Sequence, residues 1–290
     1  MPSSWLALVV GNTRLHWGYF DKGAIVATWH THHLSKLAVD QMADQIDIEA
    51  YPQAVWLLIN SLVSEPKISN LLQNLPLPVD LWLGSVVPSQ THLWKQVVPD
   101  LEPVLRSRIS LNNIYPTFGI DRAINLLGAK QALNWPILVI DSGTALTLTA
   151  GVSSKEGEMY DGSVYGGAIL PGIRLQLNAL GQQTAALGLL TPMTLAKANL
   201  EQSQLPERWA SNSEGAIASG IVYGLTSTCI DYIRDWWQTF PKGAVVVTGG
   251  DGPLLYHCLK QRTPEIASRV LINDDLAFKG MQAYRRELTT

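Results

Sequence analysis

Short apolar runs separated by turn residues occupy the first part of the chain, a pattern typical of β-strands. Residues 5–10, 15–20 and 24–29 are predicted strands, and Gly11-Asn12-Thr13-Arg14 supplies the turn between the first two. Apolar positions at helical spacing then predict a helix over 34–49. The pattern continues with a buried strand, a helix and a further strand, predicted at 54–59, 65–73 and 79–83.

Much of this pattern starts again after a proline-marked stretch from 88 to 116. A helix is predicted over 121–133, followed by strands at 137–140 and 145–150 that flank the turn Asp141-Ser142-Gly143-Thr144. Alternating strands and helices indicate an α/β architecture, and the repeated hairpin indicates an internally duplicated fold. The remaining predicted elements are an apolar helix over 214–237, a strand over 244–247, the loop Thr248-Gly249-Gly250 and a helix ending near Glu287.

Composition and charge narrow the choice of partners. The 290 residues carry 21 Lys and Arg against 24 Asp and Glu, and only 16% are charged, where about 25% is usual. So low a charged fraction favours burial in a dimer interface as well as in a core. Neither half holds the excess of basic side chains that phosphate-backbone binding requires, so we expect no nucleic-acid partner.

The sequence also predicts a cytoplasmic location. No basic region precedes the first apolar run, and the apolar stretch over 215–230 falls short of the roughly 20 residues of a membrane span. We therefore expect no signal peptide and no membrane partner. Cys229 and Cys258 fall in no metal-ligand spacing, which fits a reduced compartment and two buried thiols.

Two Gly-Thr turns are candidates for holding phosphate groups. Glycine lets the backbone of Gly11-Asn12-Thr13 or Ser142-Gly143-Thr144 approach an anion, and the threonine hydroxyl and nearby amides can donate to it. Either turn alone is more simply an ordinary hairpin, but two at equivalent places favour nucleotide binding. Thr248-Gly249-Gly250 is a third glycine-rich junction after a strand, where open α/β sheets bind ligands. The chain contains none of the common phosphate-loop or dinucleotide patterns.

Gly119-Ile120-Asp121-Arg122 opens a predicted helix and forms a further polar group. Asp121 has two interpretations: a helix N-cap, or a carboxylate that accepts a proton from a substrate hydroxyl. Arg122 beside it can bind a substrate carboxylate with two parallel hydrogen bonds. A kinase that acts on a small hydroxy acid needs both a base for the hydroxyl and a group that binds the carboxylate.

The ordered motifs resemble the type III pantothenate kinases, a family of the actin and sugar-kinase superfamily. This resemblance implies an α/β fold of two duplicated ribonuclease-H-like domains with mixed sheets and an interdomain nucleotide cleft. We expect residues 1–115 to carry the first phosphate hairpin, and residues 116–290 to carry the substrate base, the second hairpin and a dimer helix. The matching stretches are Gly11-Asn12-Thr13, Gly84-Ser85-Val86-Val87-Pro88, Tyr115-Pro116, Gly119-Ile120-Asp121-Arg122, Asp141 to Thr147, Gly166 to Gly172 and Thr248-Gly249-Gly250.

The resemblance also implies an activity: ATP-dependent phosphorylation of pantothenate to 4'-phosphopantothenate, the first step of coenzyme A biosynthesis, with Asp121 as proton acceptor. Asp141 matches the position that holds a monovalent cation, potassium or ammonium, and magnesium accompanies ATP. The implied pantothenate contacts are Tyr115, Gly119, Ile120, Asp121, Arg122 and, from the partner subunit of a homodimer, Thr184. The implied ATP contacts are Val9, Val10, Gly11, Asn12, Thr13, Arg14, Leu15, His16, Thr144, Gly249 and Gly250.

One position departs from the family pattern, because Val9 stands where the first motif normally begins with Asp. We favour retained activity, since Asp121, Arg122, Asp141 and Thr144 are all present. A nucleotide-binding or regulatory protein without catalysis is the alternative. A third interpretation, a kinase or phosphatase acting on a sugar or polyphosphate, is disfavoured because a neutral sugar offers Arg122 no carboxylate.

Other residues invite a metal-site interpretation. Asp161 and Asp251 could replace the missing carboxylate as ligands, although Asp251 is more simply a helix N-cap. Trp29-His30-Thr31-His32-His33 has three histidines, but no Cys or carboxylate lies close by in the sequence. We interpret this tract as a solvated strand end.

Overall fold

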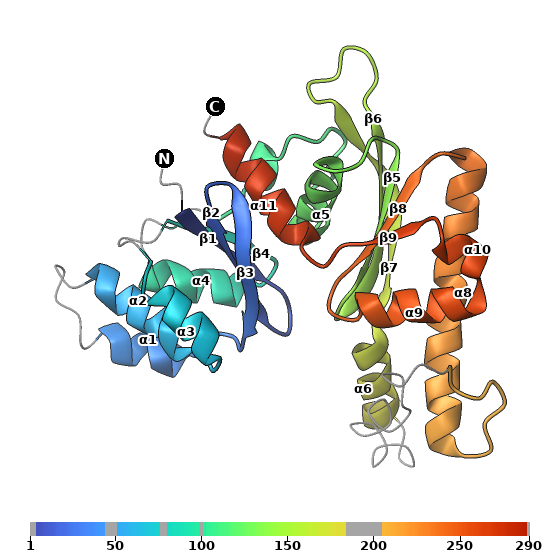
Figure 1. Cartoon of the computed structure of the whole chain (residues 1–290), viewed down its shortest axis with the longest axis horizontal. Coiled ribbons are helices and arrows are strands. Elements are labelled where there is room, and N and C mark those ends of the chain that lie inside the picture. The colour runs from blue at the N-terminus through green and yellow to red at the C-terminus, as the bar shows by residue number, and fades with distance from the viewer. Residues whose placement is uncertain are drawn as a thin grey trace. The chain divides into compact units, whose positions relative to one another are not determined.

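The computed structural model describes residues 4–43, 51–75, 80–98, 101, 103–183 and 205–288. Contacts divide the chain into two compact units (Figure 1). One comprises Met1–Ile109, Tyr115–Gly128 and Ala277–Thr290, and the other Ser110–Ile114 and Ala129–Leu276. The chain thus passes between the units four times, whereas the sequence led us to expect a single boundary at residue 115.

The first unit contains a four-stranded sheet in the order β3-β2-β1-β4. β1 pairs antiparallel with β2 and parallel with β4, so it is a central strand. Its residues from Trp5 to Leu8 are all buried, which explains an uninterrupted apolar run rather than an alternating one. The strands are β1 (Ser4–Val10), β2 (Leu15–Asp21), β3 (Ala24–Thr31) and β4 (Leu81–Ser85).

Helices complete this unit. Three indole rings lie in its core, with ring centroids 5.9 Å apart for Trp17 and Trp29 and 5.4 Å apart for Trp17 and Trp94. The helical elements are α1 (Lys36–Ala43), α2 (Tyr51–Ser61), α3 (Pro66–Leu72), α4 (Pro88–Val97), the 3₁₀ turn η2 (Arg106–Arg108), α5 (Ile120–Lys130, in this unit as far as Gly128) and α11 (Leu276–Glu287).

Two sequence predictions fail in this unit. The strand expected over 54–59 is wrong, because these residues belong to α2. Val55, Leu58 and Ile59 are buried while Leu57 is 59% exposed, which is the spacing of a helix. The prediction also missed α4 within the proline-marked stretch, where Pro88 occupies the first helical turn, a position in which its missing N–H costs nothing.

The second unit contains a five-stranded sheet in the order β7-β6-β5-β8-β9. The strands predicted at 137–140, 145–150 and 244–247 are confirmed, but β7, β9 and α6 were not predicted, and α9 was indicated only by Asp251 as a helix N-cap. The strands are β5 (Ile137–Ser142), β6 (Ala145–Ser153), β7 (Gly162–Pro171), β8 (Ala244–Thr248) and β9 (Val270–Ile272), and the helices are α6 (Ile173–Gln183), α8 (Ser213–Thr239), α9 (Gly252–Arg262) and α10 (Pro264–Ala267).

The two sheets repeat one topology, which confirms the duplicated α/β fold. In each, three antiparallel strands are followed by a fourth that pairs parallel with the first of them: β1 with β4, and β5 with β8. The turn between the first two strands, β1–β2 or β5–β6, is in each case one of the Gly-Thr turns. The candidate phosphate hairpins are therefore topologically equivalent.

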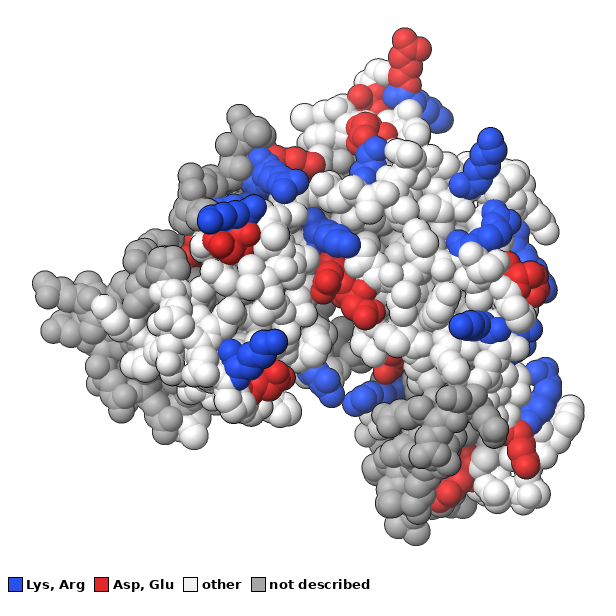
Figure 2. Space-filling model, in the orientation of Figure 1, with Lys and Arg blue, Asp and Glu red and all other residues white. Residues whose placement is uncertain are grey.

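α8 is the longest helix in the described part of the chain. It is long and apolar enough to cross a membrane by length and composition alone. However, 56% of its most apolar window is buried, and Ile221, Leu225 and Ile233 lie in the core of the second unit. Core packing thus accounts for its apolar character. On the face shown in Figure 2, acidic and basic side chains are interspersed and much of the surface carries neither.

Candidate active site

The first hairpin is formed by the end of β1, the turn Gly11-Asn12-Thr13-Arg14 and the start of β2. Val9 pairs with His16 and Val10 with Leu15, and the amide of Gly11 closes the turn on the carbonyl of Arg14 at 3.1 Å. The side chains of Asn12, Thr13 and Arg14 are exposed. The sheet thus presents the turn residues to solvent on a fixed pair of strands.

A histidine holds this turn from outside the hairpin. The Nε2 atom of His33 donates to the carbonyl oxygen of Gly11 at 2.8 Å. The sequence predicts a solvated strand end here, but His33 is only partly exposed and makes this contact. The contact spans 22 residues and involves a backbone carbonyl, so no local pattern signals it.

Tyr115 and Arg122, two of the predicted substrate-binding residues, are in direct contact. Arg122 is only 4% exposed, and its Nη1 donates to the hydroxyl oxygen of Tyr115 at 2.8 Å. Its guanidinium lies 4.5 Å from the ring centroid of Phe118, and that ring meets Tyr115 edge-on at 5.1 Å. A positive charge is therefore fixed beside Gly119 before any ligand binds.

Asp121 lies in the first turn of α5 rather than at its N-cap. One of its carboxylate oxygens, Oδ1, accepts from the amide of Arg122 at 2.8 Å. A Cβ on Gly119 would stand 2.3 Å from this same oxygen, so only glycine leaves the carboxylate its place. Burial raises the pKa of Asp121 above its ordinary 3.8, opposed by the amide and charge of Arg122 and by the residue's own amide.

The second hairpin joins β5 to β6 in the other unit. Gly143 closes the turn by donating to the carbonyl of Ala145 at 3.0 Å, and Gly172 donates to the carbonyl of Thr144 at the same distance. Thr144 is exposed. Gly172 packs so closely that a Cβ there would lie 2.2 Å from the carbonyl oxygen of Gly143.

The third glycine-rich junction meets this hairpin at the end of β8. Gly249 has φ +91°, and a Cβ there would lie 2.3 Å from Oδ1 of Asp141. The amide of Asp251 donates to the carbonyl of Ser142 at 2.8 Å. β5 and β8 are parallel neighbours, so their carboxyl ends bring Asp141 and Gly249 together. The sequence predicted both residues but not their contact.

Comparison with known proteins identifies the family. The sequence model of the type III pantothenate kinase family matches residues 5–235. The chain is 38% identical to the type III pantothenate kinase of a Nostoc strain over 283 residues, covering 97% of this chain and 94% of that protein. A Synechocystis relative is also 38% identical, over 96% of this chain and 89% of its own length. The chain belongs to the type III pantothenate kinase family. The resemblance drawn from the motifs is thereby confirmed, and the chain is a kinase.

Solved structures give this pantothenate kinase family member the expected fold. The activator of 2-hydroxyisocaproyl-CoA dehydratase from Clostridium difficile superposes with a TM-score of 0.51 at 11% identity, over 99% of this chain and 96% of the other. MreB5 of Spiroplasma citri gives 0.52 at 10% identity, over 98% and 97%. At such identities the likeness shows the fold alone, an α/β fold with two mixed sheets.

Two histidines lie close to Val9 in the first sheet. His16 lies opposite Val9 on β2, and His30 lies opposite His16 on β3. The two imidazole rings meet edge-on at 4.6 Å. Burial, with help from His30 and Arg14, lowers the pKa of His16 to about 4, so a neutral imidazole stands beside the position where the family pattern has a carboxylate.

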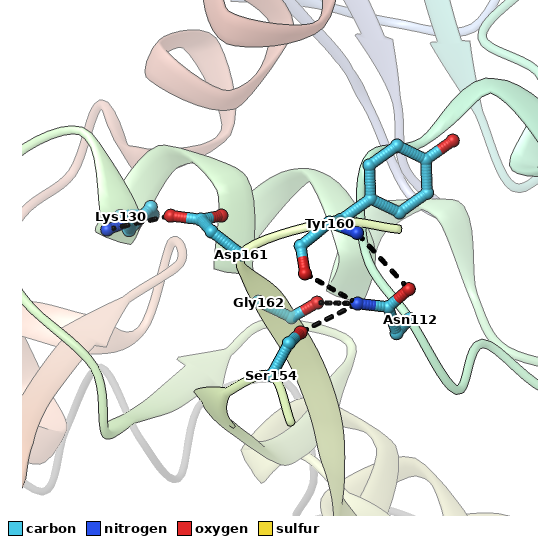
Figure 3. A network of polar contacts seen from close by, with 6 residues as sticks. All are labelled: Asn112, Lys130, Ser154, Tyr160, Asp161 and Gly162. Atoms are coloured by element: carbon cyan, nitrogen blue, oxygen red, sulfur yellow. Dashed lines mark hydrogen bonds and ion pairs between the residues drawn. The ribbon is translucent and has the colours of Figure 1, made fainter. Parts of the chain in front are cut away.

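A hydrogen-bond network that the sequence did not signal anchors residues 110–114 in the second unit (Figure 3). Nδ2 of Asn112 donates to Oγ of Ser154 at 2.6 Å and to the carbonyls of Tyr160 at 2.8 Å and Gly162 at 3.2 Å. One amide, three residues before Tyr115, thus holds both ends of the loop between β6 and β7.

The candidate metal ligands Asp161 and Asp251 lie in the second unit. Among the residues that the structure describes, no group of three or more His, Cys, Asp or Glu side chains could hold a metal. Asp161, a candidate replacement ligand, pairs with Lys130 at 3.1 Å on the surface (Figure 3). Asp251 lies at the N-cap of α9, as expected, although its side chain makes no capping bond. Thr184 lies outside the described residues.

Proposed function

We infer that the chain transfers the γ-phosphoryl group of ATP to the primary hydroxyl of pantothenate, the first step of coenzyme A biosynthesis. The observation that carries this is the family match over 5–235 together with relatives 38% identical over nearly the whole chain. These relatives bear the name of pantothenate kinases, and no finding favours the non-catalytic alternative.

Asp121 is the proposed proton acceptor. The hydroxyl proton of pantothenate passes to the carboxylate, the hydroxyl oxygen bonds to the γ-phosphorus, and the bond to the β,γ-bridging oxygen breaks to release ADP. Burial supports this role, because a raised pKa brings the carboxylate closer to the working pH, where a base is most effective. kcat/KM for pantothenate should therefore fall on the acid side with a midpoint above 3.8, the ordinary pKa of Asp.

Tyr115, Gly119, Ile120 and Arg122 are the proposed pantothenate contacts. Arg122 supplies the positive charge that a carboxylate substrate requires, and its bond to Tyr115 orders both side chains in advance. Preordering lowers the entropic cost of binding. Replacing Arg122 by Gln should raise KM for pantothenate far more than KM for ATP.

The two hairpins are the proposed nucleotide contacts, with residues 9–16 in one unit and Thr144, Gly249 and Gly250 in the other. Positioning and charge stabilisation are most of what phosphoryl transfer demands of a protein. The exposed turn residues Asn12, Thr13 and Thr144 suit this role, because they sit on hydrogen-bonded strand pairs and need little reordering to meet phosphate.

A monovalent cation, potassium or ammonium, is proposed to bind at Asp141. The backbone of Gly249 approaches this carboxylate so closely that a Cβ at Gly249 would lie 2.3 Å from its Oδ1, and a Cβ at Gly143 would lie 3.7 Å from the same oxygen. Magnesium would enter with ATP, since it usually keeps waters and needs few protein carboxylates. Bound cations would neutralise phosphate charge. Sodium in place of potassium should raise KM for ATP.

A homodimer in the cytoplasm is proposed as the working form, with Thr184 of the partner subunit completing the pantothenate site. Large exposed apolar side chains in the second unit support association: Tyr165 is 59% exposed, Ile169 64% and Trp209 90%. Both cysteines are free and buried, which suits a reduced compartment. Light scattering of the purified protein measures the association state.

Turnover of the purified protein tests the function directly. With ATP, magnesium, potassium and pantothenate, we expect ADP and a product heavier than pantothenate by one phosphoryl group. ADP release that does not depend on pantothenate, or no product at any metal concentration, would refute the assignment. The Val9→Asp variant, compared over a magnesium series, measures what the departure from the family pattern costs.

A further inference from the structure

Arg106 contacts the backbone of residues 115–122, here called the substrate segment because they include the proposed pantothenate contacts, at two points. It is the first residue of η2, and its Nε donates to the carbonyl oxygen of Phe118 at 2.9 Å. Its Nη1 donates to the carbonyl oxygen of Pro116. One guanidinium therefore holds two carbonyls, two residues apart, immediately before Gly119.

This contact complements the one made by Arg122. Arg122 orders the side chains of Tyr115 and Phe118, while Arg106 orders the backbone that carries them. The segment also closes on itself, because the amide of Phe118 donates to the carbonyl of Tyr115 at 2.9 Å. A planar guanidinium presents donors in a fixed fork, whereas a lysine ammonium is a single point charge.

The backbone on either side of Arg106, whose side chain is exposed, is anchored to the core of its unit. The amide of Leu105 donates to the hydroxyl oxygen of Tyr284 at 3.0 Å, and Tyr284 is 2% exposed. On the other side, Ile109 is buried and its amide donates to the carbonyl of Arg106 at 3.2 Å. The guanidinium thus projects from a fixed point.

We propose that Arg106 is a positioning residue for the kinase reaction. By fixing the carbonyls of Pro116 and Phe118, it sets the backbone at Gly119 and so the direction in which α5 presents Asp121. It acts through that segment and touches neither substrate. The proposal rests on the function assigned to Asp121 above.

The kinetic test compares Arg106→Ala and Arg106→Lys with the parent. Because a displaced reactive group costs about 10²-fold in rate, we expect kcat/KM for pantothenate to fall 10- to 100-fold, with KM for ATP within twofold. Lysine should restore only a minor part. The acid limb of the pH profile should also move to lower pH in Arg106→Ala, since a loosened segment admits water to Asp121.

Arg269→Ala is the matched control. Its Nη2 donates to the carbonyl oxygen of Pro241 at 2.7 Å, and its guanidinium lies 3.7 Å from the ring centroid of Trp237 in the other unit. It therefore loses the same kind of contact away from the substrate segment. Its kinetics and pH profile should match those of the parent.

Amide hydrogen exchange gives a readout that does not depend on activity. Without substrates, Arg106→Ala should accelerate exchange over 115–122 at least tenfold, and Arg269→Ala should not. Parental exchange and parental kinetics in Arg106→Ala would overturn the proposal. If Asp121→Asn keeps the parental rate, the assigned function of Asp121 fails instead, and the exchange result alone decides whether Arg106 orders the segment.

Discussion

Gly172→Ala tests whether the second hairpin holds ATP in the geometry that the structure gives it. The added Cβ would lie 2.2 Å from the carbonyl oxygen of Gly143 and 2.6 Å from that of Thr144. Real Cβ atoms essentially never approach other atoms closer than 3.0 Å. Since the atoms it meets are backbone, the hairpin and position 172 must move apart by at least about 0.8 Å, the difference between 2.2 and 3.0 Å.

Two magnitudes follow from that displacement. Overpacking of this kind destabilises proteins by about 1–3 kcal/mol, and the hydrogen bond from the Gly172 amide to Thr144 is strained with it. A shift near 1 Å in a binding group costs about 10²-fold. We therefore expect kcat/KM for ATP to fall by one to two orders of magnitude, while KM for pantothenate changes less than threefold.

Initial rates at varied ATP, together with a denaturant titration, measure both effects. Gly157→Ala is the control, because Gly157 has φ +89° and no atom within 4 Å of its Cβ position. It should lose about 1 kcal/mol through backbone strain and keep the parental KM for ATP. A Gly172→Ala enzyme that is destabilised yet has the parental KM for ATP would refute a nucleotide role for this hairpin.

Two further predictions concern histidines near the first hairpin. His33→Ala should raise KM for ATP about tenfold, because it releases the carbonyl of Gly11, and His33→Gln should restore part of the lost affinity for ATP. His32→Ala removes an exposed neighbour and should leave KM for ATP unchanged. Equal effects at both positions would contradict a role of His33 in positioning the first hairpin. The pKa of His16 is about 4 in the folded protein, against an ordinary value of 6.5. At a pH between these two values, unfolding lets His16 take up a proton. The free energy of unfolding should therefore fall by at most about 3 kcal/mol as the pH drops from 6.5 to 4. His16→Gln should flatten this dependence, leaving the smaller contribution of His30, and an unchanged slope would contradict it.

The features that could be predicted from the sequence are those encoded by short local patterns of residue types. Glycine-threonine turns between apolar runs marked both hairpins, and Gly119 with Asp121 marked the start of α5, because each depends on residue types at fixed short spacing. The strand predicted at 54–59 was wrong because a short apolar run fits either a strand or a buried helix. The exposure of Leu57, with Val55, Leu58 and Ile59 buried, distinguishes the two only once the structure is known.

The contacts that hold the site were not predictable in the same way. His33 to Gly11, Arg106 to Phe118 and Asn112 to Gly162 each join a side chain to a backbone carbonyl. Every residue has a carbonyl, so the partner's identity leaves no trace in the sequence. Such contacts depend on how strands and turns distant in the chain pack together.

The rate of Asp121→Asn tests the central claim most directly. Formation of 4'-phosphopantothenate is followed with saturating ATP and pantothenate, and the unfolding midpoint verifies that the variant folds. Removing a positioned general base costs about 10²–10⁴-fold, so we expect kcat to fall within that range with KM for ATP near parental. A variant that folds normally and retains more than a tenth of the parental kcat would contradict the account.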